Sequence, residues 1–474
     1  MLFHTPAFGA FFLAFLISYL PVRGSRSGVF VIVLFSSFFY GTWNWRFLPL
    51  LWFTIVLDFS IGYAMGKIQD QRTRTKLLWT SVTCNLGILG YFKYWNFLVH
   101  SFVSDPVWAG RLNLGDIILP LGISFYVFQS MSYIIDVYRG VQKPLKSIID
   151  FAAFVTFFPH LIAGPIQRIQ QLVPQILKPD AITWNRITSG ILVFSTGLFR
   201  KALGDTLAAF HDPIFSNLAS SQPAEVVFGI VSFGLQIYLD FSGYSEMAVG
   251  IARAIGIDLV TNFDAPYLST SIRDFWRRWH ISLSMWLRDY LYISLGGSRV
   301  GISRQVGNLL FTMALCGLWH GAGWNFALWG LLHGFLLGAN VLFRRFLPER
   351  KPDSGLASWI YRSLSLTVTF TAANYAWIYF RIPTLEGSLI ANAKLLRWIQ
   401  SPSWPSVPPG IVGIFVVVLM MDILTRLKGE IFPLHIEFTG GRALRYGVAA
   451  ACLVIISIVL TIGRPTQQFI YFQF

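Results

Sequence analysis

His320 is the side chain in this sequence that is best placed to move a proton, because it lies in a long apolar stretch, GNLLFTMALCGLWHGAGWNFALWGLLHG. Basic segments flank this stretch on both sides, which predicts a hairpin within the membrane. Along a helix that starts at Gly307, His320 follows after ~20 Å, deep in a hydrocarbon core that is ~30 Å thick. An ionisable group at that depth is costly unless it has a partner or a cavity. We therefore predict a functional role for His320, with Trp319 and Gly321 beside it contacting substrate.

A second group of polar side chains interrupts apolar sequence in SIRDFWRRWHISLSMWLRDYLYISLGG. The spacing predicts one helix whose polar face carries Arg273, Arg277, His280, Ser284 and Arg288. On one interpretation this is an interfacial amphipathic helix whose arginines contact lipid phosphates. On the other, the arginines bind an anionic donor or polymer, because guanidinium groups match phosphate and carboxylate. The pattern favours neither interpretation over the other.

Further polar groups stand alone in apolar sequence, notably Asp240 in LQIYLDFSGYSEMAVG. Such groups either line a water-filled pathway or pair with one another to hold a helical bundle together. His333 has ordinary helical surroundings, so a structural role is its natural interpretation. The sequence has no Walker motif, GxSxG elbow or HExxH motif, and its three cysteines have no metal-binding spacing.

The composition indicates a polytopic membrane protein, since 54% of the 474 residues are hydrophobic and only 12% are charged. The net charge of +15 arises from Lys and Arg in short clusters between apolar runs, which is typical of cytoplasmic loops and not of a nucleic-acid-binding surface. At ~20 residues per span we expect roughly eleven to thirteen membrane segments, some of them re-entrant. The alternation of the basic loops places the N-terminus and the C-terminal tail outside the cytoplasm.

Six stretches of the chain resemble the membrane-bound O-acyltransferase family, in the branch that contains alginate O-acetyltransferases and D-alanyl transferases. They are LPLGISFYVFQSMSYIIDVYRG, FPHLIAGPIQR, QIYLDFSGYSEMAVG, RDFWRRWHISLSMWLRDYLYISLGG, LWHGAGWNFALWGLLHG and WIYFR. The resemblance implies an all-α helical bundle around a tunnel. It places the family's deep catalytic histidine on His320 and a second family position on His280. It also implies one membrane domain, with N-terminal spans in residues 1–149, a catalytic core in 150–345, C-terminal spans in 346–463 and a tail in 464–474.

The same resemblance implies an acyltransferase with no bound cofactor, which uses a cytoplasmic thioester, expected to be acetyl-CoA, to acetylate a cell-surface polysaccharide such as alginate. A thioester is already activated, so the enzyme chiefly needs a base such as His320 to deprotonate a hydroxyl. Arg273, Arg277 and Asp240 are expected to bind substrate. Expected partners are a periplasmic SGNH-type O-acetyltransferase, a polysaccharide synthesis and export complex and lipid of a bacterial inner membrane.

Three alternatives remain open beside polysaccharide acetylation. The chain could transfer D-alanyl or another acyl group to a cell-surface polymer. It could be a transporter that exports an acyl donor through its polar intramembrane residues. It could also be a non-catalytic scaffold for an acetylation complex, in which case substitution of His320 would be harmless.

The C-terminal hexapeptide FIYFQF has Tyr471 as its single hydroxyl among six side chains. The segment is too short to span a bilayer, which needs ~20 apolar residues. One hypothesis is that the phenylalanines dock the tail and that Tyr471 receives the acetyl group and passes it to an extracytoplasmic transferase. The other is that the tail is an interfacial aromatic anchor whose hydroxyl is incidental.

Overall fold

The computed structural model describes residues 1–115, 117–346, 355–427 and 441–461, and this part of the chain is helical without strands. It forms two compact units. Unit 1 is mainly Met1–Phe194 with Tyr244–Val260, and unit 2 is mainly Ser195–Gly243 with residues 261–427. The long helices α11 (Trp184–Ser216) and α12 (Pro223–Ala254) contribute residues to both units. The all-α class expected from the sequence is confirmed, whereas the four-part division of one domain stays a prediction.

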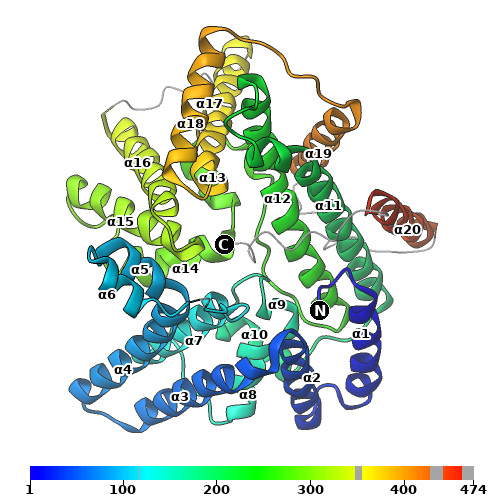
Figure 1. Ribbon diagram of the computed structural model, residues 1–474. Helices are drawn as coiled ribbons and strands as arrows, with labels where there is room; N and C mark the ends of the chain where they lie inside the picture. The colour runs from blue at the N-terminus through cyan, green and yellow to red at the C-terminus, as the bar shows by residue number, and fades with distance from the viewer. Residues whose placement is uncertain (116, 347–354, 428–440, 462–474) are drawn as a thin grey trace. The chain divides into compact units, whose positions relative to one another are not determined.

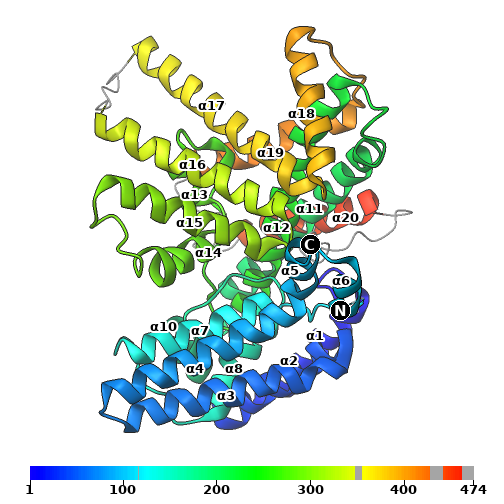
Figure 2. The same ribbon diagram turned by 60° about the vertical axis from the view of Figure 1, so that its left-hand side comes forward.

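Unit 1 is built around α3 (Leu48–Lys67), α4 (Gln71–Leu89) and α7 (Ile123–Tyr138), which pack side by side in Figures 1 and 2. The side chain of Asp70 accepts a hydrogen bond from the Thr73 N–H group at 2.9 Å and thereby caps the first turn of α4. The other helices of this unit are α1 (Pro6–Tyr19), α2 (Arg26–Asn44), α5 (Trp95–Phe102), α6 (Pro106–Leu112), α8 (Ile148–Thr156), α9 (Phe158–Leu161) and α10 (Ile169–Leu177).

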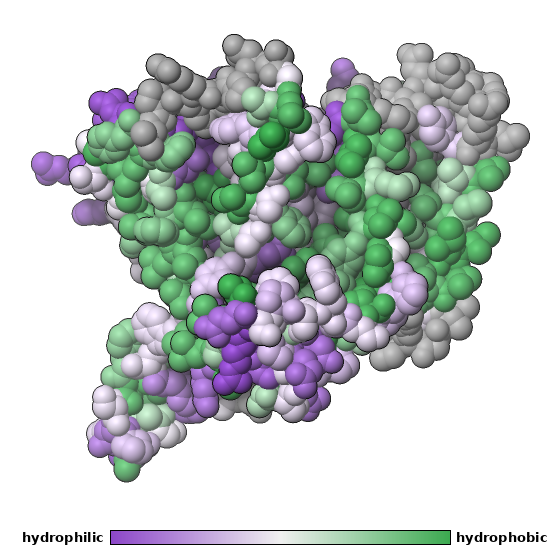
Figure 3. Space-filling model, turned by 90° about the horizontal axis from the view of Figure 1, so that it is seen from above, coloured by the Kyte–Doolittle hydropathy of each residue, from purple (hydrophilic) through white to green (hydrophobic). Residues whose placement is uncertain are grey.

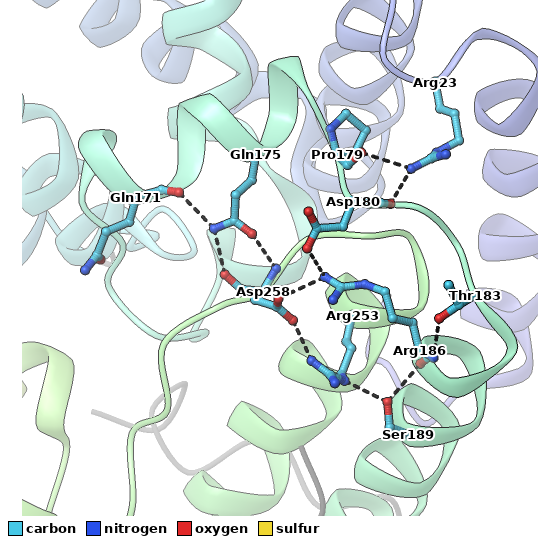
Figure 4. A network of polar contacts seen from close by, with 10 residues as sticks. All are labelled: Arg23, Gln171, Gln175, Pro179, Asp180, Thr183, Arg186, Ser189, Arg253 and Asp258. Atoms are coloured by element: carbon cyan, nitrogen blue, oxygen red, sulfur yellow. Dashed lines mark hydrogen bonds and ion pairs between the residues drawn. The ribbon is translucent and has the colours of Figure 1, made fainter. Parts of the chain in front are cut away.

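A polar network in unit 1 fixes the chain where it leaves α12 (Figure 4). Asp258 forms ion pairs with Arg253 at 2.7 Å and with Arg186, from the start of α11, at 2.8 Å. The backbone N–H of Asp258 also donates to the Gln175 side chain at 2.8 Å. Arg186 further pairs with Asp180 at 3.1 Å. These contacts anchor the segment that leads from α12 towards the candidate functional residues of unit 2.

Unit 2 contains the predicted hairpin, formed by α15 (Ile302–His320) and α16 (Trp324–Phe346), which lie side by side in Figure 1. Before the hairpin come α13 (Ile272–Arg278), α14 (Ile281–Trp286) and a π-helical turn, Leu287–Tyr292. After it come α17 (Gly355–Arg381), α18 (Leu385–Gln400), α19 (Pro409–Leu427) and α20 (Gly441–Thr461), of which α20 contributes to both units. Helix α16 packs against α13 and α17 as well as α15.

Glycines allow the two helices of the hairpin to approach closely. A Cβ atom at Gly317 would lie 2.0 Å from the Phe326 carbonyl oxygen, and one at Gly330 would lie 2.1 Å from the Met313 carbonyl oxygen. Gly334, four residues after Gly330, faces Leu310 in the same way. Small residues at this spacing are typical of helix pairs in membranes, where close backbone packing replaces the hydrophobic effect.

The surface of the molecule suits a lipid environment. Four helical segments among the described residues are long and apolar enough to cross a membrane, and they are Arg26–Lys67, Pro223–Ala254, Trp324–Phe346 and Pro409–Leu427. Large apolar side chains such as Leu13, Ile17 and Phe335 are 60%, 67% and 65% exposed. Apolar residues cover broad areas of the face shown in Figure 3. The total of eleven to thirteen spans and the orientation of the termini stay predictions.

Candidate active site

His320 lies at the end of α15, where the chain turns back into the hairpin. The helix ends there because Gly321 is extended, with φ −155° and ψ 148°. A Cβ atom at Gly321 would lie 2.1 Å from the Phe326 ring, so the turn has room for glycine alone. The predicted hairpin therefore turns directly after His320. His320 is only 3% exposed.

Aromatic rings surround the His320 imidazole on several sides. The ring centres of Trp319, Trp329 and Phe380 lie 4.9, 5.2 and 5.3 Å from that of His320. Phe380 comes from the end of α17, and Asn325 holds that end by donating to the Tyr379 and Ile382 carbonyl oxygens, each at 3.1 Å. Three rings on different elements thus confine the imidazole in a largely apolar environment.

The prediction that His280 shares a helix face with Arg273 and Arg277 is wrong. Helix α13 ends at Arg278, and His280 has φ 43° and ψ 55°, which is left-handed backbone. The chain therefore changes direction before α14 begins at Ile281. As a result His280 is fully buried, whereas Arg273 and Arg277 are exposed.

The change of direction at His280 brings the two histidines together. Their ring centres are 6.4 Å apart. Trp319 contacts both rings, since its ring centre lies 6.1 Å from that of His280 and 4.9 Å from that of His320. Phe241 of α12 packs edge-on against His280 at 4.6 Å. The structure therefore joins His280, His320 and Trp319 in one cluster, which we call the histidine cluster.

The arginines predicted to bind an anion line a cavity of about 790 Å³ in unit 2. Arg273 and Arg277 come from α13, Arg288 from the π-helical turn and Arg344 from the end of α16. Ser284 also lines the cavity, as the predicted face required, and none of the described residues in its wall is acidic. We call this space the arginine cavity.

Within the described part of the chain, ion pairs compensate only some of the positive charge of the arginine cavity. Arg288 has a carboxylate partner, Asp289, at 2.6 Å. Partial burial, and then the charges of Arg277 and Arg344, lower the pKa of Arg273. A guanidinium stays protonated in proteins despite such a shift, so the repulsion persists until an anion relieves it. The cavity is therefore suited to phosphate or carboxylate groups.

The wall of the arginine cavity adjoins the histidine cluster. Ile281, which lines the cavity, directly follows His280 in the chain. Trp276 also lines the cavity, and its ring centre is 5.9 Å from that of Trp329, which contacts His320. On this path Trp276 and Trp329 separate the cavity from the His320 imidazole.

Asp240 and His333 have partners that account for their burial. Asp240 forms an ion pair with Lys201 at 2.8 Å, and Lys201 also contacts Asp205. A substrate-binding role for Asp240 stays a prediction. His333 is fully buried and accepts a hydrogen bond from the Trp276 indole at 3.3 Å. Its expected structural role stays a prediction.

Some residues of the site carried no clear signal in the sequence. Arg344 belongs to a basic cluster at the end of an apolar helix, which is the usual pattern of a cytoplasmic boundary. Phe241, Trp329 and Phe380 are aromatic residues in a chain with 16% aromatic content, so their contacts with the histidines could not be singled out. The predicted relay residue Tyr471 lies outside the described residues.

Comparison with known proteins decides the family. The model of the membrane-bound O-acyltransferase family matches residues 141–380, slightly more than half of the chain. The chain belongs to this family. Both histidines and most of the arginine cavity lie within the matched region.

Relatives of the chain include enzymes with different acyl acceptors. A protein of Pseudomonas putida named "Probable alginate O-acetylase AlgI" is 34% identical over the full length of both chains. The peptidoglycan O-acetyltransferase of Helicobacter pylori is 34% identical over 82% of this chain and 78% of its own length. The teichoic acid D-alanyltransferase of Bacillus subtilis is 28% identical over 55% of this chain and 66% of its own length.

Membership in the membrane-bound O-acyltransferase family makes the protein a multi-pass membrane acyltransferase. The expected enzyme class, an acyltransferase, is thereby confirmed in preference to the transporter and scaffold alternatives. The family does not by itself assign a donor, an acceptor or the roles of individual residues.

Proposed function

We propose that this acyltransferase transfers an acetyl group from a cytoplasmic thioester, acetyl-CoA, for O-acetylation of an extracytoplasmic polysaccharide. The observation that carries the proposal is the histidine cluster, with two buried imidazole centres 6.4 Å apart, next to a cavity lined by four arginines. Relatives named as O-acetylating enzymes match more of the chain, at higher identity, than the D-alanyltransferase does. This difference favours acetyl over D-alanyl transfer.

In the proposed reaction His320 is the general base. Its imidazole takes the proton of the acceptor hydroxyl while the oxygen attacks the thioester carbonyl. The carbon–sulfur bond then breaks, and the proton passes from the imidazolium to the departing thiolate. His280 orients the reacting groups or stabilises the oxyanion. Trp319, Trp329 and Phe380 exclude water, which protects the thioester from hydrolysis and strengthens the polar interactions.

The arginine cavity would hold the phosphates of the donor. Arg273 and Arg277 are exposed to it, and guanidinium groups bind phosphate through paired N–H donors. A contact of Gly321 with the substrate stays a prediction, because the Phe326 ring occupies the space where its side chain would lie. The charge clusters of the sequence place this cavity on the cytoplasmic side.

For the acceptor side we propose that His320 deprotonates the Tyr471 hydroxyl, which takes the acetyl group from the thioester with release of the thiol. The acetylated tyrosine then passes the acetyl group to a periplasmic SGNH-type transferase that works with a polysaccharide synthesis complex. The proposal rests on the sequence of the tail, on its extracytoplasmic orientation and on a localisation in a bacterial inner membrane. A short tail reaches a buried histidine more easily than a polymer does.

Replacement of His320 tests the proposed function. His320→Asn removes the base and keeps a planar polar side chain, so we expect polymer acetylation to fall by about 10²- to 10⁴-fold. The measurement is acetate released by alkali from the purified extracellular polymer, with the amount of membrane-inserted protein checked by immunoblot. Normal acetylation by a well-expressed His320→Asn variant would refute the mechanism.

The matched control is His333→Asn. This histidine is as buried as His320 and lies in the same hairpin, and asparagine keeps an acceptor for the Trp276 indole. We expect acetylation within a few-fold of the wild type. Equal losses in both variants would show that the hairpin tolerates no histidine replacement, and the loss at His320 would then say nothing about a base.

A further inference from the structure

Asn262 lies in the segment between α12 and α13 and binds the chain directly after His280. Its carbonyl oxygen accepts a hydrogen bond from the Ile281 N–H at 2.9 Å. Its side-chain oxygen accepts from the Ser282 N–H at 3.3 Å and from the Ser282 hydroxyl at 2.6 Å. Asn262 is 2% exposed and Ser282 is 3% exposed, so no water competes for these bonds.

A second backbone contact lies on the other side of the turn. The N–H of Asp264 donates to the carbonyl oxygen of Arg278 at 3.1 Å. Residues 262–264 therefore bind the chain before and after His280, and these contacts hold His280 in place. We call this arrangement the 262–264 clamp.

The clamp acts on a backbone conformation that is unfavourable by itself. His280 has φ 43°, and left-handed backbone brings the Cβ atom of a non-glycine residue close to its own backbone. Without the turn, α13 would continue and would carry His280 onto the exposed arginine face. With it, the imidazole lies 6.4 Å from that of His320, between Phe241 and Trp319.

We propose that Asn262, assisted by Ser282, is a positioning residue that holds His280 in its left-handed turn and thereby in the histidine cluster. This inference rests on the proposed function, because it assigns His280 a part in the same acyl transfer. Asn262 contacts no reacting group in this scheme. It acts through the backbone of Ile281 and Ser282.

The kinetic test uses release of thiol from acetyl-CoA by the purified full-length protein, with a small hydroxyl compound in excess as the acetyl acceptor. Because small displacements of a catalytic group are costly, we expect Asn262→Ala to lower kcat by about 10- to 100-fold and to leave the KM for acetyl-CoA within about twofold. Ser282→Ala, which removes one of the two bonds to the Asn262 side chain, should cause a smaller loss. A higher KM with unchanged kcat would overturn the assignment.

A double-mutant cycle separates positioning from a general structural effect. If Asn262 acts through His280, then Asn262→Ala should lower kcat no further in a His280→Ala background. An undiminished loss in that background would overturn the inference. The matched control is Asn374→Ala, because Asn374 is 4% exposed and donates only within its own helix, to Phe370, in the contacts that the structure gives. We expect its kcat to stay near that of the wild type.

A second measurement needs no activity and so distinguishes this inference from the proposed function. Glycine adopts left-handed backbone without strain, so His280→Gly should have a higher Tm than His280→Ala. The difference should disappear when Asn262→Ala is added, because the turn is then no longer enforced. A difference that persists unchanged would overturn the role of Asn262, even if no thiol release were detected in any variant.

Discussion

The two histidines of the candidate active site are held in different ways. His320 ends a regular helix, and its position follows from the packing of α15 against α16 and from three aromatic neighbours. His280 has left-handed backbone, which is uncommon for residues other than glycine, and hydrogen bonds from residues 262–264 hold the chain around it. We therefore expect His320 to tolerate small changes in distant loops, whereas His280 depends on particular hydrogen bonds.

Charge reversal in the arginine cavity tests how the donor binds. We expect Arg277→Glu to raise the KM for acetyl-CoA by about 10-fold or more, because it replaces a phosphate-binding cation with an anion. The acceptor dependence should change little. The measurement is the rate of thiol release over a range of donor concentrations.

Arg299→Glu is the matched control for Arg277→Glu. It changes the net charge by the same amount, and Arg299 is not among the residues that line the arginine cavity. A donor KM that rises equally in both variants would indicate a general electrostatic effect. A donor KM that changes in neither would mean that the arginines only anchor α13 in lipid headgroups.

At the scale of single residues, the sequence indicated the burial of His320 but not the backbone conformation of His280, and the roles of both histidines stay predictions. A histidine next to glycines in a long apolar run is visible without a structure, because burial of an ionisable group is costly. The geometry of His280 was not visible, since RRWHIS contains neither glycine nor proline to mark a break in the helix. The break depends on Asn262, which lies 18 positions earlier.

The hairpin of α15 and α16 is the element that carries His320, and its two helices meet through glycines. These close contacts leave little freedom for the two helices to slide past one another. The position of His320 along the interface between α15 and α16 is therefore fixed by Gly317, Gly330 and Gly334.

Substitution of one of these glycines tests the hairpin. A methyl group at Gly317 would collide with the Phe326 carbonyl oxygen at 2.0 Å, so we expect Gly317→Ala to destabilise the protein by about 1–3 kcal/mol and to lower activity. The measurements are thermal unfolding in detergent and thiol release. Gly307→Ala is the control, because nothing lies within 4 Å of its Cβ position and the substitution favours the helix.

If Gly317→Ala had the stability of the Gly307→Ala variant, the helices would have to be further apart than the structure places them. Loss of activity with unchanged stability would instead indicate a displacement of His320 alone.

The elements around the hairpin were predicted unevenly. Basic segments at both ends and the apolar run between them indicated two helices joined by a turn, and the structure has this hairpin. The helix expected from Arg273 to Arg288 was wrong, because a period of 3.6 residues describes the arginines but not the tertiary contacts that break the helix. Arg273, Arg277, Ser284 and Arg288 nevertheless line one cavity, as the predicted face required. The break in the helix removes His280 from this group and does not remove Ser284.

For the whole molecule, composition was sufficient to predict a helical membrane protein, and the apolar surface agrees with this class. Composition could not predict the division into two interleaved units, in which residues 244–260 belong with the N-terminal part of the chain. Such groupings arise from contacts between distant segments, as between Asp258 and Arg186 in Figure 4.

The orientation of the whole chain and the role of its tail are tested together by Tyr471→Phe. This variant keeps the ring and removes the hydroxyl, so under the relay proposal we expect loss of polymer acetylation at normal protein levels. Mass spectrometry of the C-terminal peptide should show an acetyl group on the wild-type tyrosine and none in His320→Asn.

Retained acetylation in Tyr471→Phe would favour the interfacial anchor and eliminate the relay. Tyr471→Ala is the companion variant, because it removes the ring as well. If the tail is an anchor, polymer acetylation should fall in Tyr471→Ala alone. If the tail is a relay, polymer acetylation should fall equally in both variants.

The left-handed backbone at position 280 restricts which residues this site can accept during evolution. Asparagine and aspartate enter this region of backbone space several-fold more readily than most other residues, and β-branched side chains almost never do. If the histidine at position 280 were lost in evolution, asparagine, aspartate or glycine would therefore replace it most easily. The set of permitted side chains is thus decided by the φ angle of 43° before any demand of the chemistry is applied.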